Sequence, residues 1–120
     1  MGIERIIRGS SAVGFSWPSL VARLNEHGEK PILRMIDGLP AFPDEVPEQG
    51  WKELRIGLLG GMVTLHRSGN DIRCVTWGTA DPQLQRSWDA LTSTLATIMN
   101  GQIETDGKLE TAEEFQQRIG

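Results

Sequence analysis

The sequence predicts an α+β domain in which an antiparallel sheet carries helices on one face. Two observations carry this prediction. Residues 53–77 contain three strand-like stretches joined by the dipeptides Gly60-Gly61 and Gly69-Asn70, and both dipeptides are common in hairpin turns. Residues 82–99 repeat apolar side chains at helical spacing, which indicates one long amphipathic helix able to cover the sheet.

The register of the three central strands follows from counting outward from the two turns. A two-residue turn at Gly60-Gly61 pairs Arg55 with His66, and one at Gly69-Asn70 pairs His66 with Arg73. Directly opposed residues share a face of the sheet. Both turns gather apolar residues on the same face, and a slip of one residue would scatter them. These residues are Leu54, Ile56, Leu58, Val63, Leu65, Ile72 and Cys74.

Two further strands complete a predicted sheet of four or five strands. They are residues 3–8 and the segment "PILRMID" that begins at Pro31, and a short additional strand fits residues 102–105. Residues 38–50, which connect the segment "PILRMID" to the three central strands, hold three prolines, three acids and two glycines. This composition excludes a helix or a central strand. We expect this segment to be an extended surface connection, and loops of such length are often functional or mobile.

Helix-capping signals mark the beginning of each predicted helix. Ser16 is placed to cap a first helix over residues 17–27, with Phe15 and Leu20 as its hydrophobic staple. Asp81 caps the long helix, and Pro82 occupies its first position, where a missing N–H costs nothing. Residues 111–114, "TAEE", form a capping box for a last helix.

The domain division follows from these elements and from the charge pattern. Residues 1–106 form a single α+β domain, and residues 107–120 form an acidic C-terminal helix that we expect to dock on the same domain. Residues 101–120 carry two basic and five acidic side chains, a balance of −3 within a net charge of −4 for the chain. Because nucleic acid and anionic membranes favour basic chains, we expect neither as a partner.

Composition excludes several other classes of protein. One cysteine cannot form an internal disulfide, and a structural zinc site needs four Cys or His ligands. The first residues lack the apolar core of a signal peptide, and no window is apolar over 18 residues. Neither a phosphate-binding loop nor a metal-ligand motif is present. We therefore expect a cytoplasmic protein without metal or cofactor.

Three side chains could suggest nucleophilic catalysis, and each has a simpler explanation. Cys74 and His66 flank the second turn, but the predicted register places them on opposite faces, beyond hydrogen-bond reach. Cys74 is then a small core residue. Ser16 lies in "GFSWP", where a nucleophile elbow would have glycine in place of Pro18. Its position before the first helix makes it a cap.

The second face of the predicted sheet is the candidate binding surface. Arg55, His66 and Arg73 are predicted to form one row, and like charges directly opposed are unfavourable. Glu53 or Asp71, acids of residues 38–50, or a bound anion would neutralise them. The other end of this face is apolar, with Met62 and Trp77 beside Leu59 and Val75. An exposed apolar patch of this kind marks an interface.

Three coverings of the second face remain open at this point: the chain's own last helix or Pro-rich segment, a partner protein or second copy, and a small anionic ligand. We expect a non-catalytic interaction or self-association domain, with a homodimer as one form, that uses Arg55, His66, Arg73, Met62 and Trp77. The alternative is a small-anion-binding domain or enzyme with Arg55, His66 and Arg73 as the anion site and His66 as proton carrier. No motif is specific enough to indicate a family.

Overall fold

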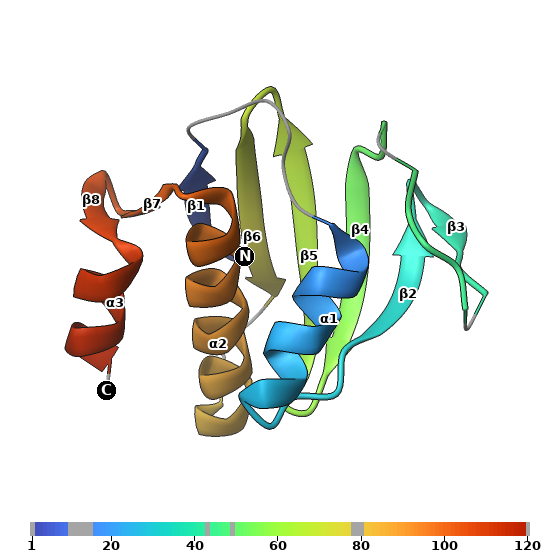
Figure 1. Cartoon of the computed structure of the whole chain (residues 1–120), viewed down its shortest axis with the longest axis horizontal. Coiled ribbons are helices and arrows are strands. Elements are labelled where there is room, and N and C mark those ends of the chain that lie inside the picture. The colour runs from blue at the N-terminus through green and yellow to red at the C-terminus, as the bar shows by residue number, and fades with distance from the viewer. Residues whose placement is uncertain (1, 10–15, 43, 49, 78–80, 120) are drawn as a thin grey trace.

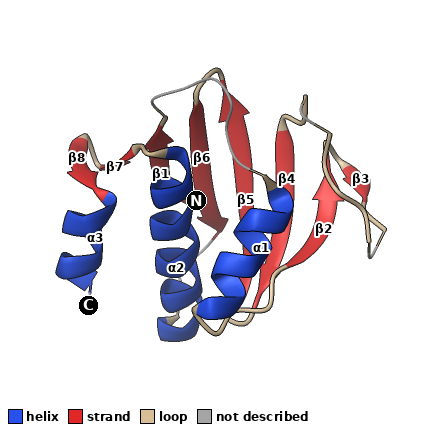
Figure 2. Cartoon of the chain, in the orientation of Figure 1, coloured by secondary structure: helices blue, strands red, loops and turns tan. Residues whose placement is uncertain are grey.

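The computed structural model describes residues 2–9, 16–42, 44–48, 50–77 and 81–119. These residues form the predicted α+β arrangement, with helices on one face of an antiparallel sheet (Figures 1 and 2). The strands are β1 (Gly2–Arg8), β2 (Ile32–Ile36), β3 (Leu39–Pro40), β4 (Glu53–Leu58), β5 (Gly61–Ser68), β6 (Asp71–Trp77), β7 (Gln102–Thr105) and β8 (Lys108–Thr111). The helices are α1 (Trp17–Glu26), α2 (Pro82–Met99) and α3 (Ala112–Ile119).

The sheet is larger than the sequence predicted, with eight strands in the order β3-β2-β4-β5-β6-β1-β7-β8. The predicted meander β4-β5-β6 lies at its centre. The first strand inserts on the far side of β6, where Arg5 pairs with Cys74, and β7 then pairs with β1. The short edge strands β3 and β8 were not predicted, because two and four residues give too little alternation to recognise.

The helices begin where their caps predicted. The Asp81 carboxylate accepts a hydrogen bond from the Leu84 amide at 2.8 Å. At α3, the Thr111 hydroxyl accepts from the Glu114 amide at 3.0 Å, and the Glu114 carboxylate accepts from the Thr111 amide at 2.9 Å. This reciprocal pair is the predicted capping box. Ser16 is the N-cap residue of α1, although its side chain makes no capping bond; Phe15 of the predicted staple lies outside the described residues.

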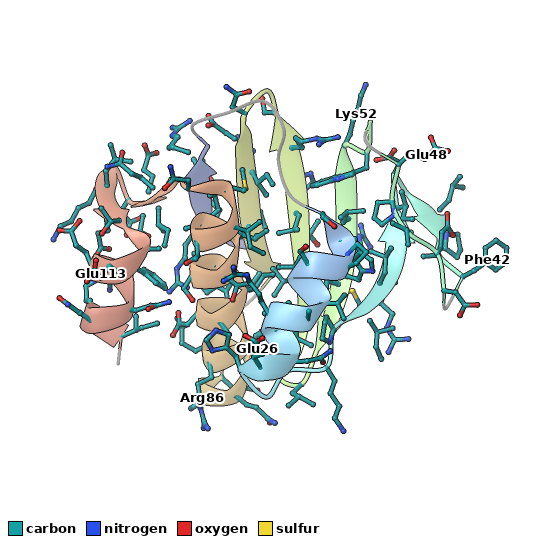
Figure 3. All side chains as sticks on the ribbon, in the orientation of Figure 1. Glu26, Phe42, Glu48, Lys52, Arg86 and Glu113 are labelled. Carbon is teal, nitrogen blue, oxygen red and sulfur yellow. The ribbon has the colours of Figure 1, made fainter. Side chains whose placement is uncertain are left out.

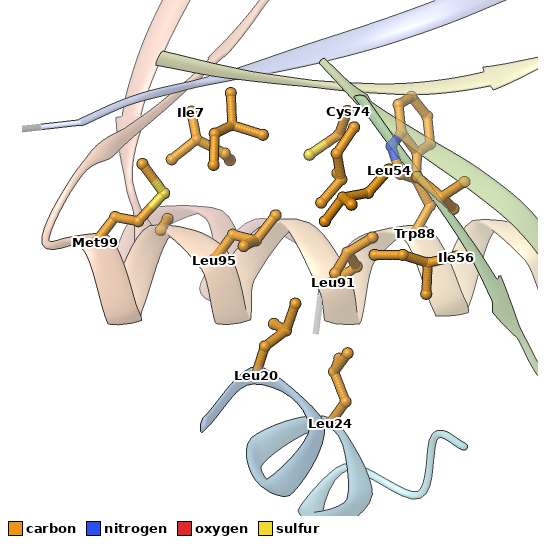
Figure 4. Packing of buried hydrophobic residues seen from close by; sticks show 14 of the residues in the cluster. Ile7, Leu20, Leu24, Leu54, Ile56, Cys74, Trp88, Leu91, Leu95 and Met99 are labelled. Carbon is orange, nitrogen blue, oxygen red and sulfur yellow. The ribbon is translucent and has the colours of Figure 1, made fainter. Parts of the chain in front are cut away.

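The core lies between the sheet and the helices, and it contains every member of the apolar set predicted for residues 53–74. Leu91 and Leu95 of α2 and Leu20 and Leu24 of α1 are fully buried against it (Figure 4). Burial of such side chains is the main favourable term in folding, at about 25 cal/mol per Å² of apolar surface. The predicted inward face of the meander is therefore confirmed.

The first hairpin turn differs from the prediction by one residue. Leu59 and Gly60 form the turn, so Ile56 pairs with Val63, Arg55 with Thr64 and Glu53 with His66. The predicted pairing of Arg55 with His66 is therefore wrong by two residues. A shift of two leaves every side chain on its predicted face, since the strand period is two. The second turn is at Gly69-Asn70 as predicted, with His66 opposite Arg73.

Helix α3 packs on the same side of the sheet as α2 (Figure 1). Its Phe115 ring is fully buried and lies 4.9 Å from the Arg5 guanidinium, which stacks on Trp88 at 3.8 Å. Arg5 also donates a 2.6 Å hydrogen bond to Asp89. A buried charge of this kind is held by its carboxylate partner and by the electron-rich faces of both rings. These contacts attach α3 to the helical layer.

A second ion pair holds α3 to β8 and makes its attachment sensitive to acid. Arg118 donates to the buried Glu110 carboxylate at 2.9 Å, and this hydrogen bond lowers the pKa of Glu110. A carboxylate with a lowered folded-state pKa stabilises the fold above its unfolded pKa of about 4.3, and the contribution disappears as pH falls through the folded value.

We therefore expect Glu110→Gln to cost about 1 kcal/mol at pH 7 and progressively less below about pH 4. Denaturant unfolding of both proteins between pH 7 and pH 3 measures this difference. Stability curves that stay parallel over the whole range would contradict the role of Glu110.

Candidate binding face

The side of the sheet away from the helices, which we call the open face, carries no described helix (Figure 2). Alternation along each strand places its residues opposite the core set. Its members on the four central strands are Glu4, Ile6, Arg8, Glu53, Arg55, Gly57, Met62, Thr64, His66, Ser68, Asp71, Arg73 and Val75. Arg55, Met62, His66 and Arg73 lie on this face, as their alternation in the sequence predicts. Trp77 ends β6, and its side chain lies outside the described part of the structure.

Helix α3 and the described residues near the two ends of the Pro-rich segment, two of the predicted coverings, pack on other parts of the molecule. Helix α3 packs on α2, as described above. Ala41, near the beginning of the Pro-rich segment, packs against the core, and Trp51, directly after it, is buried in the core. Between them, Phe42 is 76% exposed and extends outward at the β3 edge (Figure 3).

The predicted row of three cations is divided between two rows of the sheet. One row runs Arg55, Thr64, Val75, Glu4 across β4, β5, β6 and β1. The next row runs Glu53, His66, Arg73, Ile6, Glu104 across the same strands and β7. Arg55 therefore stands diagonally to His66, and only His66 and Arg73 are directly opposed.

Acidic side chains neutralise most of the arginines of the open face. Arg55 lies 3.4 Å from Glu53, one of the acids that the sequence suggested, and Arg73 lies 3.2 Å from Glu4. Arg8 bonds both Asp71 at 2.6 Å and Glu104 at 3.2 Å, which raises the Arg8 pKa. Four arginines face four acids over the described strands: Arg8, Arg34, Arg55 and Arg73 against Glu4, Glu53, Asp71 and Glu104.

Glu4, like Arg8 and Glu104, belongs to this network although the sequence pattern did not predict it there. Residues 3–8 were recognised as a strand, and their alternation separates Glu4 from the core residue Ile7. No turn connects β1 to β6, however, because the pairing joins segments about 70 residues apart. Counting could therefore not place Glu4 beside Arg73.

The open face is apolar at one end. Met62 is 47% exposed, and Ile32 is 49% exposed two strands away, with Gly57 between them. Thr64 and Val75, one row further along, are buried although no described helix packs on this side. Leu59, which the sequence placed in the same cluster, lies in the turn and is exposed.

The structure separates Cys74 from His66, as the register predicted. Cys74 is fully buried on the helical side, and burial raises the pKa of its thiol to about 12. Almost no thiolate exists at neutral pH, so Cys74 is suited to packing rather than to nucleophilic attack.

We expect native protein to be inert toward a thiol reagent at pH 8 and denatured protein to react with one equivalent per chain. Reaction of the native chain at the denatured rate would contradict the burial of Cys74.

Comparisons of the chain with protein-family models, with curated proteins and with solved structures found no match. Among the described residues, no helix combines the length and apolar character needed to cross a membrane. The same residues contain no cluster of three His, Cys, Asp or Glu side chains that could hold a metal ion.

Proposed function

We propose that this chain is a self-association domain whose open face binds the open face of a second copy. The observation that supports this most is the charge pattern of one row. On the four central strands, Arg55 stands at one end of this row, Glu4 at the other, and the small buried side chains of Thr64 and Val75 lie between them. When a second copy of this row is turned by 180° and laid on the first, the positive end of each row meets the negative end of the other.

A two-fold axis parallel to the strands, between β5 and β6, uses this complementarity. It brings β4 of one copy over β1 of the other, so that Arg55 faces the second copy's Glu4 twice in the dimer. Rotation about this axis leaves each residue at the same position along the strand direction, so the apolar ends around Met62 in the two copies also meet. Complementary charge pairs and apolar contact are both typical of specific interfaces.

The face is large enough for such a dimer. The sheet lies in the plane of the two longer dimensions of the molecule, 36 and 32 Å (Figure 1). A stable interface buries roughly 800 Å² on each partner. Because three of the four arginines of the face, Arg8, Arg55 and Arg73, already pair with acidic neighbours, its charge balance favours a complementary protein surface over a small anion.

Met62→Glu tests the proposal. It places a charge at the apolar end, where the dimer would bury it against the second copy's apolar end, and we expect at least a tenfold rise in the dimer dissociation constant. Light scattering over a concentration series measures this change. Ile119→Glu is the matched control, because Ile119 is 40% exposed on α3 at the opposite side. Equal effects of the two variants would contradict the proposal.

A further inference from the structure

The Pro-rich segment, residues 38–50, carries the three most exposed large apolar side chains among the residues that the structure describes. Phe42 is 76% exposed, Leu39 70% and Val46 55%, and each of the other described large apolar side chains is 53% exposed or less. Figure 3 shows Phe42 pointing away from the molecule at the β3 edge. Single exposed apolar side chains are ordinary on a protein surface, but several in one short segment are typical of a binding site.

Hydrogen bonds fix the turn that presents Phe42. Its amide donates to the Glu45 carboxylate at 3.0 Å, and the Glu45 amide donates to the Phe42 carbonyl at 3.0 Å. Directly after the segment, Trp51 is buried in the core, and its carbonyl accepts from the Arg67 guanidinium at 3.0 Å. A turn that is already ordered loses little conformational entropy when a partner binds.

The orientation of Phe42 is the reverse of what core packing alone would favour. Its neighbour Ala41 packs against the core, while the much larger phenyl ring of Phe42 faces water. An aromatic ring gains far more than a methyl group from burial, because the gain follows the apolar area removed from water. A partner that covers the ring would recover this favourable term.

The charge of the segment indicates the chemistry of such a partner. Residues 38–50 contain three acids and neither Lys nor Arg. Asp44 and Glu48 are exposed, and neither pairs with a basic side chain in the described part of the chain. The complementary surface is therefore apolar with a border of Lys or Arg. Strand addition at this edge is disfavoured, since β3 has only two residues and Pro40 has no N–H to donate.

We propose that residues 39–48 are a docking segment for an amphipathic helix of another protein, in which an apolar stripe is bordered by Lys or Arg. Phe42 is the main anchor in the stripe, and Val46, directly after the Phe42–Glu45 turn, is the second. The basic side chains of the helix pair with Asp44 and Glu48. Such a helix presents apolar and basic groups side by side, as the segment requires. The proposal does not depend on the open-face dimer, because β3 is the outermost strand of the sheet.

A synthetic peptide of about 18 residues, with Leu at helical spacing on one face and Lys elsewhere, tests this proposal in an NMR titration of the full chain. We expect shifts centred on residues 39–48 and a dissociation constant on the order of 100 μM. A peptide of the same composition whose Leu residues do not share a face, and one with Glu in place of Lys, should each bind at least tenfold more weakly. Absence of shifts in residues 39–48 at about 1 mM peptide overturns the proposal, and so does equal binding of the Glu peptide.

Variants assign the contacts. Phe42→Ser should weaken peptide binding at least tenfold and melt at the wild-type temperature, because the ring is exposed. Asp44→Asn combined with Glu48→Gln should weaken it at least threefold. The matched controls, Leu109→Ser on β8 at the other edge and Glu113→Gln on α3 (Figure 3), should leave binding unchanged. Equal losses in Phe42→Ser and Leu109→Ser overturn the proposal. A changed dimer dissociation constant in Phe42→Ser would make a second copy the occupant and overturn the assignment to another protein.

Discussion

Replacing Gly60 with alanine is expected to destabilise the protein by about 3 kcal/mol. A Cβ at this position would lie 2.3 Å from the Gln83 carbonyl oxygen and 2.6 Å from the Leu84 Cα. Both atoms belong to the backbone at the beginning of α2, which cannot move without displacing the helix from the sheet. Denaturant unfolding of the variant measures the effect.

The same turn is held to the helical layer by hydrogen bonds. The Gly60 amide donates to the Ser87 hydroxyl at 2.9 Å, and the Leu59 amide donates to the buried Glu29 carboxylate at 3.1 Å. Ser87 in turn donates to Glu29 at 3.1 Å. An added methyl group at Gly60 would therefore push the turn away from α2 and also disturb the hydrogen bonds of the Leu59 and Gly60 amides.

Gly50→Ala is the control for this prediction. Gly50 has open space around its Cβ position and no positive φ, so the substitution is expected to change stability by less than about 0.5 kcal/mol. Similar losses for Gly50→Ala and Gly60→Ala would contradict the close packing of the turn on α2.

This contact also explains why the sequence misplaced the first turn. A Gly-Gly dipeptide permits a turn at either register, because glycine accepts positive φ at both positions. In the folded chain, residue 60 must be glycine because the Gln83 backbone leaves no room for a Cβ. Gly61 adopts the positive φ of 143° at the beginning of β5. Local turn preferences could not reveal this choice, since it depends on a helix more than 20 residues away.

The sequence predicted best what depends on local periodicity. The core face of residues 53–74, the span of α2 and both capping interactions at Asp81 and Thr111 follow from spacing alone, and the structure confirms them. What it could not predict are the long-range strand neighbours. The insertion of β1 between β6 and β7 brings Glu4 to Arg73, and no sequence pattern encodes that pairing.

Reversing the charges at both ends of the Arg55–Glu4 row is expected to weaken the dimer and then restore it. Arg55→Glu and Glu4→Arg should each raise the dissociation constant at least tenfold, because each places like charges opposite one another across the interface. The double variant recreates opposite charges in the dimer. We expect its dissociation constant to return close to that of the wild type, as measured by sedimentation velocity over a dilution series.

Recovery in the double variant can only come from contact between copies. Within one chain, Arg55 and Glu4 lie on strands separated by three strand spacings, about 14 Å, which is too far for an ion pair. Within each chain of the double variant, the new Glu at position 55 still lies beside Glu53, and the new Arg at position 4 still lies beside Arg73. These like-charge neighbours are the same as in the single variants, so they cannot cause a recovery. Additive losses without recovery would show that these two residues do not meet across the proposed axis.

The most direct test of the account is the mass of the wild-type chain at sedimentation equilibrium. The proposed use of the open face predicts a species of twice the 13.3 kDa chain mass at micromolar to millimolar concentrations. It also predicts that Met62→Glu shifts the equilibrium toward 13.3 kDa and that Ile119→Glu leaves it unchanged. A wild-type chain that stays at 13.3 kDa at the highest of these concentrations would contradict self-association through this face.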